Sequence, residues 1–139
     1  MSETKKSERG GIEKWKAVAH MLGLRGKIFL GGVENCEFSL EKLSSILDFG
    51  FIERGFKYNY SPTVETYYEF GKRAVLSGAS VEYFGILENE YRDDAMLIIE
   101  GVKVTDFINS ASLILDFAQT FHSADEFTAN SELLRAWYD

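Results

Sequence analysis

The only cysteine of the chain, Cys36, follows two adjacent glycines, Gly31 and Gly32, and precedes Ser39. A loop that leads from a strand into a helix can bind an anion, because the first turn of the helix has free N–H groups and a positive dipole end. The same helix end would stabilise a thiolate on Cys36. These residue types suggest a small-molecule site formed by Gly31, Gly32, Cys36 and Ser39.

Neither anion binding by this loop nor a nucleophilic role for Cys36 is supported by a complete sequence motif. Residues 31–36 lack the spacing of the dinucleotide-binding and P-loop glycine motifs, and neighbouring glutamates would repel a phosphate. A thiolate nucleophile needs a base, and the two histidines, His20 and His122, are both far from Cys36 in sequence. The sequence therefore favours glycines that form a turn and a buried cysteine that acts as a small apolar residue.

Two acidic segments contain residue types that bind metal ions. Residues 88–94 include four carboxylates, which hard cations prefer, but they lack the EF-hand spacing and its glycine. His122, Asp125 and Glu126 lie within a turn of one another, and such a group is too small to complete a coordination shell. We therefore predict no metal site and no cofactor.

Aromatic residues are the feature that most favours a binding function. They make up 14% of the chain and are concentrated in its middle third and near residue 139. Aromatic side chains in excess of what a core needs often line an interface or a ligand pocket. We expect Tyr58, Tyr60, Trp137 and Tyr138 to form a surface for a protein partner or for a homodimer.

Length and composition indicate one packed domain. The chain has 139 residues, of which 45% are hydrophobic, and this is enough to bury a core. We expect a globular domain over residues 11–139 and a disordered leader over residues 1–10. The single cysteine and the absence of a signal-peptide pattern favour a cytoplasmic location.

The net charge of −7 is unevenly distributed. Residues 1–27 carry seven basic and three acidic side chains, whereas residues 28–139 carry eight basic and nineteen acidic ones. An acidic body repels the phosphate backbone of nucleic acids and anionic lipid. We therefore expect no nucleic-acid partner and no membrane partner.

The spacing of apolar residues predicts the elements that must position these side chains. Helical periodicity predicts helices over residues 11–23, 39–50, 62–78, 105–121 and 123–137. Ser39 is predicted to cap the second helix, and Ser123 with Glu126 forms a capping-box pattern before the last. Short apolar or alternating segments predict strands over residues 27–33, 51–60, 79–87 and 95–104.

This order of elements indicates an α/β or mixed α+β fold. We expect one mixed sheet of three to four strands, a β-hairpin in the C-terminal half and about five flanking helices, with the terminal helix packed on its own domain.

Two functions remain open. The first is a non-enzymatic interaction or regulatory protein that acts through its aromatic surface. The second is a small-molecule-binding or enzymatic domain with a crevice at the end of the 27–33 strand.

Overall fold

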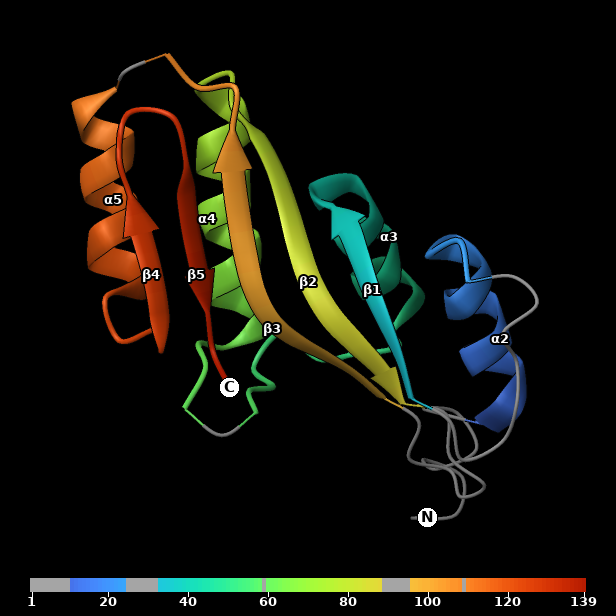
Figure 1. Cartoon of the computed structure of the whole chain (residues 1–139). Helices are drawn as coiled ribbons and strands as arrows, with labels where there is room; N and C mark the ends of the chain where they lie inside the picture. The colour runs from blue at the N-terminus through green and yellow to red at the C-terminus, as the bar shows by residue number, and fades with distance from the viewer. Residues whose placement is uncertain (1–10, 25–32, 59, 89–95, 109) are drawn as a thin grey trace.

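The computed structural model describes residues 11–24, 33–58, 60–88, 96–108 and 110–139. These residues form a mixed α+β fold with one five-stranded sheet in the order β1-β2-β3-β5-β4 (Figure 1). The strands are β1 (Val33–Ser39), β2 (Ser80–Glu88), β3 (Met96–Thr105), β4 (Glu126–Ala129) and β5 (Leu134–Trp137). The described helices are α2 (Gly11–Met21), α3 (Leu40–Phe49), α4 (Val64–Leu76) and α5 (Ala111–Phe121).

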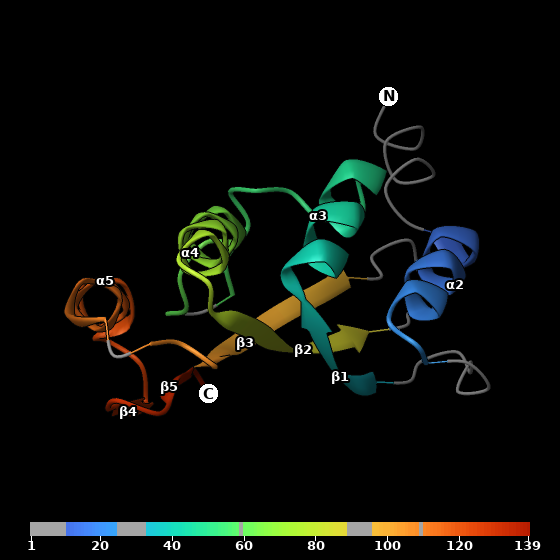
Figure 2. The ribbon, with the colours of Figure 1, turned by 90° about the horizontal axis from the view of Figure 1, so that it is seen from above.

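All neighbouring strands of the sheet are antiparallel. The predicted hairpin between the third and fourth strands is confirmed as the β2–β3 pair, whereas the expectation of a mixed sheet is wrong. Figure 2 shows that the four described helices lie along one face of the sheet, so the described residues form two layers. The opposite face, which we call the open face, carries none of the described helices.

The core fills the space between the two layers. Strand β2 alternates between buried and half-buried residues, as expected of a strand with only one covered face. The largest fully buried side chains come from all four described helices and from the three central strands. Helices α2, α4 and α5 contribute the aromatic side chains Trp15, Tyr67, Phe70, Phe117 and Phe121, and α3 contributes the aliphatic Leu43 and Ile46. The strands β2, β3 and β5 contribute Tyr83, Leu87, Leu97 and Leu134.

A tyrosine ties the sheet to the helical layer. The Tyr83 hydroxyl of β2 donates a hydrogen bond of 2.7 Å to the backbone carbonyl of Tyr67 in α4. It can reach this carbonyl because residue 71, one turn later, is a glycine, and a Cβ there would clash with the Tyr83 hydroxyl. Gly71 therefore sets how closely α4 packs on the sheet.

The helix ends follow local capping chemistry. Ser39 caps α3 as predicted, since its hydroxyl accepts a hydrogen bond of 3.2 Å from the Lys42 N–H. Gly50 ends α3 in the left-handed conformation, at φ 83°. Helix α4 starts after the cap Thr63 rather than at Pro62, and α5 starts after Ser110 rather than at Thr105.

The predicted strand over residues 51–60 is wrong, because the described residues of this segment, 51–58 and 60, form no strand and lie between α3 and α4. Its carbonyls accept from the first turn of α4: Val64 N–H donates to Phe56 at 2.9 Å, and Glu65 N–H donates to Arg54 at 2.7 Å. These bonds satisfy N–H groups that a helix start leaves without a partner. The segment therefore caps a helix instead of extending a sheet.

The predicted helix over residues 123–137 is also wrong, because this segment forms the β4–β5 hairpin. The Asn130 side chain accepts hydrogen bonds from the N–H groups of Glu132 and Leu133, at 2.8 and 2.9 Å, and so builds the turn. The hairpin nevertheless packs on its own domain, since β5 pairs with β3 and Leu134 is fully buried. The expectation that this segment docks within the domain is thus confirmed.

Most of the predicted 27–33 strand, with Gly31 and Gly32, lies outside the described residues. Residues 33–39 form strand β1, which contradicts the prediction that a loop leads through Cys36 into α3. The strand runs directly into the helix at Ser39. Cys36 is therefore held in a regular strand beside Gly85 of β2.

Candidate functional site

The open face carries an aromatic pair at its centre. Phe84 of β2 and Trp137 of β5 flank Gly101 of β3, because Gly101 pairs with Phe84 on one side and with Trp137 on the other. The two ring centroids are 5.2 Å apart and the rings are tilted by 44°. Such contacts add about 0.5–1.5 kcal/mol beyond the burial of area. Phe84 and Trp137, here called the aromatic pair, therefore form a fixed apolar surface.

Gly101 makes this contact across three strands possible. A Cβ at this position would lie 2.5 Å from the Ala136 carbonyl oxygen and 3.3 Å from an edge carbon of the Trp137 ring. The Trp137 ring therefore lies over the glycine, where a larger residue would push it away. A strand glycine often marks a close approach of this kind.

Charged side chains surround the aromatic pair. Lys103 pairs with Glu82 at 3.4 Å, and Arg135 pairs with Glu126 at 3.0 Å. The Lys103 ammonium also lies 5.9 Å from the centre of the Phe84 ring, and the Arg135 guanidinium lies 5.3 Å from that of Trp137. Protein-binding surfaces are enriched in aromatic residues and arginine at their centre and have a polar rim.

A pocket with acidic walls, here called the acidic pocket, lies beside the aromatic pair. Its volume is about 360 Å³, and Phe84, Trp137, Glu37 and Glu100 are among its lining residues. Asn35, Cys36 and Gly85 line it from β1 and β2, and Leu22 and Leu24 from the end of α2 and the turn that follows. The pocket therefore combines aromatic, aliphatic and carboxylate walls.

A β-bulge explains why Glu100 lines this pocket. Phe84 pairs with Gly101 while the next residue, Gly85, pairs with Ile99, so Glu100 is an extra residue of β3 without a ladder partner on β2. Bulges redirect side chains and are frequent near binding sites. The pKa of Glu100 is raised because the carboxylate is partly desolvated and because Asp139 adds a second negative charge.

Cys36 lacks the exposed side chain and the low thiol pKa that a nucleophilic cysteine needs. Its side chain is 7% exposed and belongs to the core. Burial, together with the negative charges of Glu100 and Glu37, raises the pKa of the thiol to about 12. Because a thiolate rather than a thiol attacks electrophiles, Cys36 stays unreactive near neutral pH.

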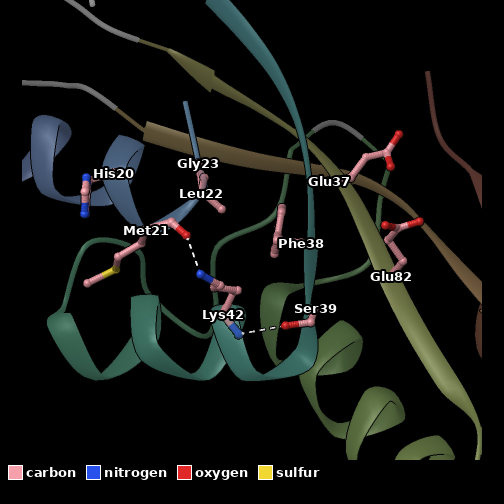
Figure 3. A pocket seen from close by; sticks show the side chains of 9 residues that line it. All are labelled: His20, Met21, Leu22, Gly23, Glu37, Phe38, Ser39, Lys42 and Glu82. Carbon is pink, nitrogen blue, oxygen red and sulfur yellow. Dashed lines mark hydrogen bonds between the residues drawn. The ribbon is translucent and has the colours of Figure 1, made fainter. Parts of the chain in front are cut away.

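A larger pocket lies between the end of α2 and the start of α3 and shares Leu22 and Glu37 with the acidic pocket (Figure 3). Its volume is about 480 Å³, and its ionisable or polar lining residues are His20, Glu37, Ser39, Lys42 and Glu82. The Lys42 ammonium points toward α2, where it donates a hydrogen bond of 2.8 Å to the Met21 carbonyl. The lysine is therefore already engaged in joining two helices.

The structure separates the residues predicted to form the small-molecule site. Cys36 lines the acidic pocket, and Ser39 caps α3 and lines the larger pocket. Gly31 and Gly32 lie outside the described residues, so their place in either pocket stays a prediction.

The structure also separates the four predicted interface residues. Tyr58 and Tyr60 are 47% and 91% exposed, and they lie between α3 and α4 rather than on a strand of the sheet. Trp137 is half-buried on the open face, whereas its neighbour Tyr138 is buried in the core. Successive residues of an extended chain point to opposite faces, so Trp137 and Tyr138 cannot share one surface.

The sequence analysis did not identify Phe84, Glu100, Lys103 or Arg135 as site residues. The signal for Phe84 and Arg135 is the alternation of β2 and β5, in which every second residue faces away from the core, whereas Glu100 and Lys103 lie in β3, which does not alternate. This signal identifies a face, but it does not show that β2 and β5 lie on either side of β3. That neighbourhood depends on the strand order.

Two further properties of the described residues concern ligands. Within the described ranges, no three side chains of His, Cys, Asp and Glu are grouped as a metal site. None of the described helices has the length and apolar character needed to cross a membrane. Comparison with protein-family models, with curated proteins and with solved structures finds no match for this chain.

Proposed function

We propose that this chain is a non-enzymatic cytoplasmic protein that binds a protein partner through the open face of its sheet. The observation that carries this proposal is the aromatic pair, whose two tilted rings meet across three strands on the face without described helices. Large aromatic side chains within a charged rim supply most of the binding energy in many interfaces. The proposed surface is centred on the aromatic pair, and it differs from the surface predicted from the sequence, which combined Tyr58, Tyr60, Trp137 and Tyr138.

The charge of the chain favours a basic partner over a second copy. The net charge is −7, so two copies repel each other, whereas a basic surface is attracted over a distance of about 8–10 Å at physiological salt. On the open face, the ion pairs of Lys103 and Arg135 leave little positive charge to attract an acidic partner. A heteromeric complex is therefore preferred to a homodimer.

Capture of partners from a lysate of the native cells, with the immobilised full chain, tests the proposal. The variant Trp137→Ala should reduce the amount of captured partner at least tenfold, since central aromatic residues contribute about 2 kcal/mol or more. Tyr60→Ala is the matched control, because Tyr60, at 91%, is the most exposed of the described tyrosines and lies between α3 and α4 rather than on a strand of the sheet. Equal capture by Trp137→Ala and wild type, with both folded, would contradict the proposal.

The second candidate function is the binding of a small molecule. The larger pocket favours it, since a volume of about 480 Å³ falls within the range of about 300–1,000 Å³ typical of such sites. Nucleotides, sugar phosphates, thiols and divalent metals can be screened by thermal shift, because a ligand of the native state raises the melting temperature. No concentration-dependent shift with any of them would remove the support for this candidate.

A further inference from the structure

We infer that the acidic pocket binds one cationic side chain, an arginine or a lysine, of the partner protein. The aliphatic stem would pack against the aromatic pair and the charged group would face Glu37 and Glu100. This inference rests on the proposed function and specifies what the open face recognises. The chemistry comes from the walls of the pocket, two aromatic rings and two carboxylates around one cavity.

The size of the pocket fits a single long side chain. Its volume of about 360 Å³ is near the lower end of the range for ligand sites. Leu22 and Leu24, which follow α2, add apolar surface to its lining. Arginine and lysine suit such a cavity because their stems pack on apolar surface while their charged ends stay with polar groups.

Among the described residues that line the pocket, none is a cation. The carboxylates of Glu100 and Glu37 line the pocket, and both help to raise the pKa of the nearby Cys36 thiol. A third carboxylate, that of Asp139, raises the pKa of Glu100. Among the described residues, the cations nearest in the strand ladder are Lys103 and Arg135, and both are paired with glutamates that do not line the pocket. A cation from outside would relieve this repulsion.

The geometry of β3 supports a binding role for Glu100. A regular β3 would have no extra residue at this place, and the bulge supplies one whose side chain lines the cavity beside Trp137. The Trp137 indole is itself held in place, since its N–H donates to the Asp139 carboxylate at 3.1 Å. One wall of the pocket is therefore oriented before a ligand arrives, which lowers the cost of ordering on binding.

Nuclear magnetic resonance titration of the full chain tests the inference with small probes. The probes are N-acetyl-arginine amide, N-acetyl-lysine amide and N-acetyl-citrulline amide, the last being an uncharged analogue of the first. We expect saturable shifts of the Trp137 indole N–H and of the Glu100 and Gly101 amides with the cationic probes. Binding of citrulline should be about tenfold weaker or more, because it lacks the charge-assisted hydrogen bond.

Variants connect this binding to the carboxylates. Glu100→Gln should weaken the binding of the arginine probe about tenfold and leave citrulline unaffected. Glu88→Gln is the matched control, because Glu88 belongs to β2 and does not line the pocket. Thermal melting of both variants checks that they are folded. Equal affinity for arginine and citrulline, no saturable shift at the Trp137 indole, or an unchanged affinity in Glu100→Gln would overturn the inference.

The failure of this inference is distinguishable from the failure of the proposed function. If Trp137→Ala abolishes partner capture but no cationic probe binds, the open face is an interface and the acidic pocket is not its cation site. If partner capture is unchanged in both Trp137→Ala and Glu100→Gln, the proposed function itself is wrong. If Glu100→Gln weakens both the arginine probe and partner capture, both proposals are supported.

Discussion

At the scale of single residues, two neighbouring tyrosines differ in how their hydroxyl groups are satisfied. Tyr67 and Tyr83 are both fully buried, with ring centroids 6.1 Å apart. The Tyr83 hydroxyl donates to a helix carbonyl, whereas the Tyr67 hydroxyl has no hydrogen-bond partner among the described residues. A buried polar group without a partner opposes folding, so one hydroxyl stabilises the fold and the other does not.

Substitution of each tyrosine by phenylalanine measures this difference. We expect Tyr83→Phe to lower the free energy of unfolding by about 1 kcal/mol, since it removes a buried hydrogen bond. We expect Tyr67→Phe to leave that free energy unchanged or to raise it, because it removes an unpaired hydroxyl while keeping the ring. Urea denaturation followed by circular dichroism gives both values. A Tyr67→Phe variant that loses as much stability as Tyr83→Phe would refute the assignment.

At the scale of elements, the last strand of the described chain lies inside the sheet and not at its edge. Strand β5 pairs with β3 on one side and with β4 on the other, and Leu134 and Ala136 are fully buried. Tyr138 continues into the core, and its N–H donates to the Glu100 carbonyl at 2.7 Å. The β4–β5 hairpin therefore covers both the edge of β3 and part of the core.

Removal of residues 123–139 should consequently unfold the domain. The deletion exposes the edge of β3 and removes Leu134 and Tyr138, and large apolar side chains contribute about 1.5–3 kcal/mol each when fully buried. The total stability of a domain is only about 5–15 kcal/mol. Circular dichroism and thermal melting of the 1–122 chain provide the measurement. A cooperative melting transition in this chain would show that the hairpin is dispensable.

Local sequence predicted the elements that local interactions determine. Ser39 and Gly50 delimit α3 correctly because capping depends on a few neighbouring atoms. The errors arose where short patterns fit two structures. The alternation of residues 51–60 resembles a strand, and Ser123 with Glu126 resembles a capping box, yet strand pairing and tertiary hydrogen bonds decide both cases. The alternation of Leu134, Arg135, Ala136 and Trp137 was the signal for β5.

The candidate site was less predictable than the elements. Phe84 and Trp137 are distant in sequence, and they meet only because β3 lies between β2 and β5. Trp137 was identified from its residue type alone. Glu100 reaches the acidic pocket through a bulge, which depends on the pairing register and not on local propensity.

At the scale of the whole molecule, three buried acidic groups couple stability to alkaline pH. Burial raises the pKa of the Cys36 thiol from 9.0 to about 12, and it also raises the pKa values of the Tyr67 and Tyr83 hydroxyls well above the usual value of 10.0. Between pH 9 and pH 12 the unfolded chain loses these protons while the folded chain keeps them. The native state is therefore increasingly disfavoured as the pH rises through this range.

We expect the free energy of unfolding contributed by these groups to be constant up to about pH 9 and to fall above it. Each group can change the free energy of unfolding by at most about 1.4 kcal/mol per pH unit. Urea denaturation at pH 8, 9, 10 and 11 measures the slope. Cys36→Ala should reduce the slope between pH 9 and pH 10, where the thiol of the unfolded chain ionises ahead of its tyrosines. A stability that stays constant up to pH 11 would contradict this coupling.

The two tryptophans lie in different environments, so their fluorescence reports separately on the core and on the open face. Trp15 of α2 is 1% exposed within the core, whereas Trp137 lies half-buried on the open face. Acrylamide, a neutral quencher, should therefore reduce the fluorescence of Trp137 and leave that of Trp15 nearly unchanged. A ligand on the open face would shield Trp137 from the quencher, and unfolding would expose Trp15 to it. Binding and unfolding thus give separate optical signals without an added label.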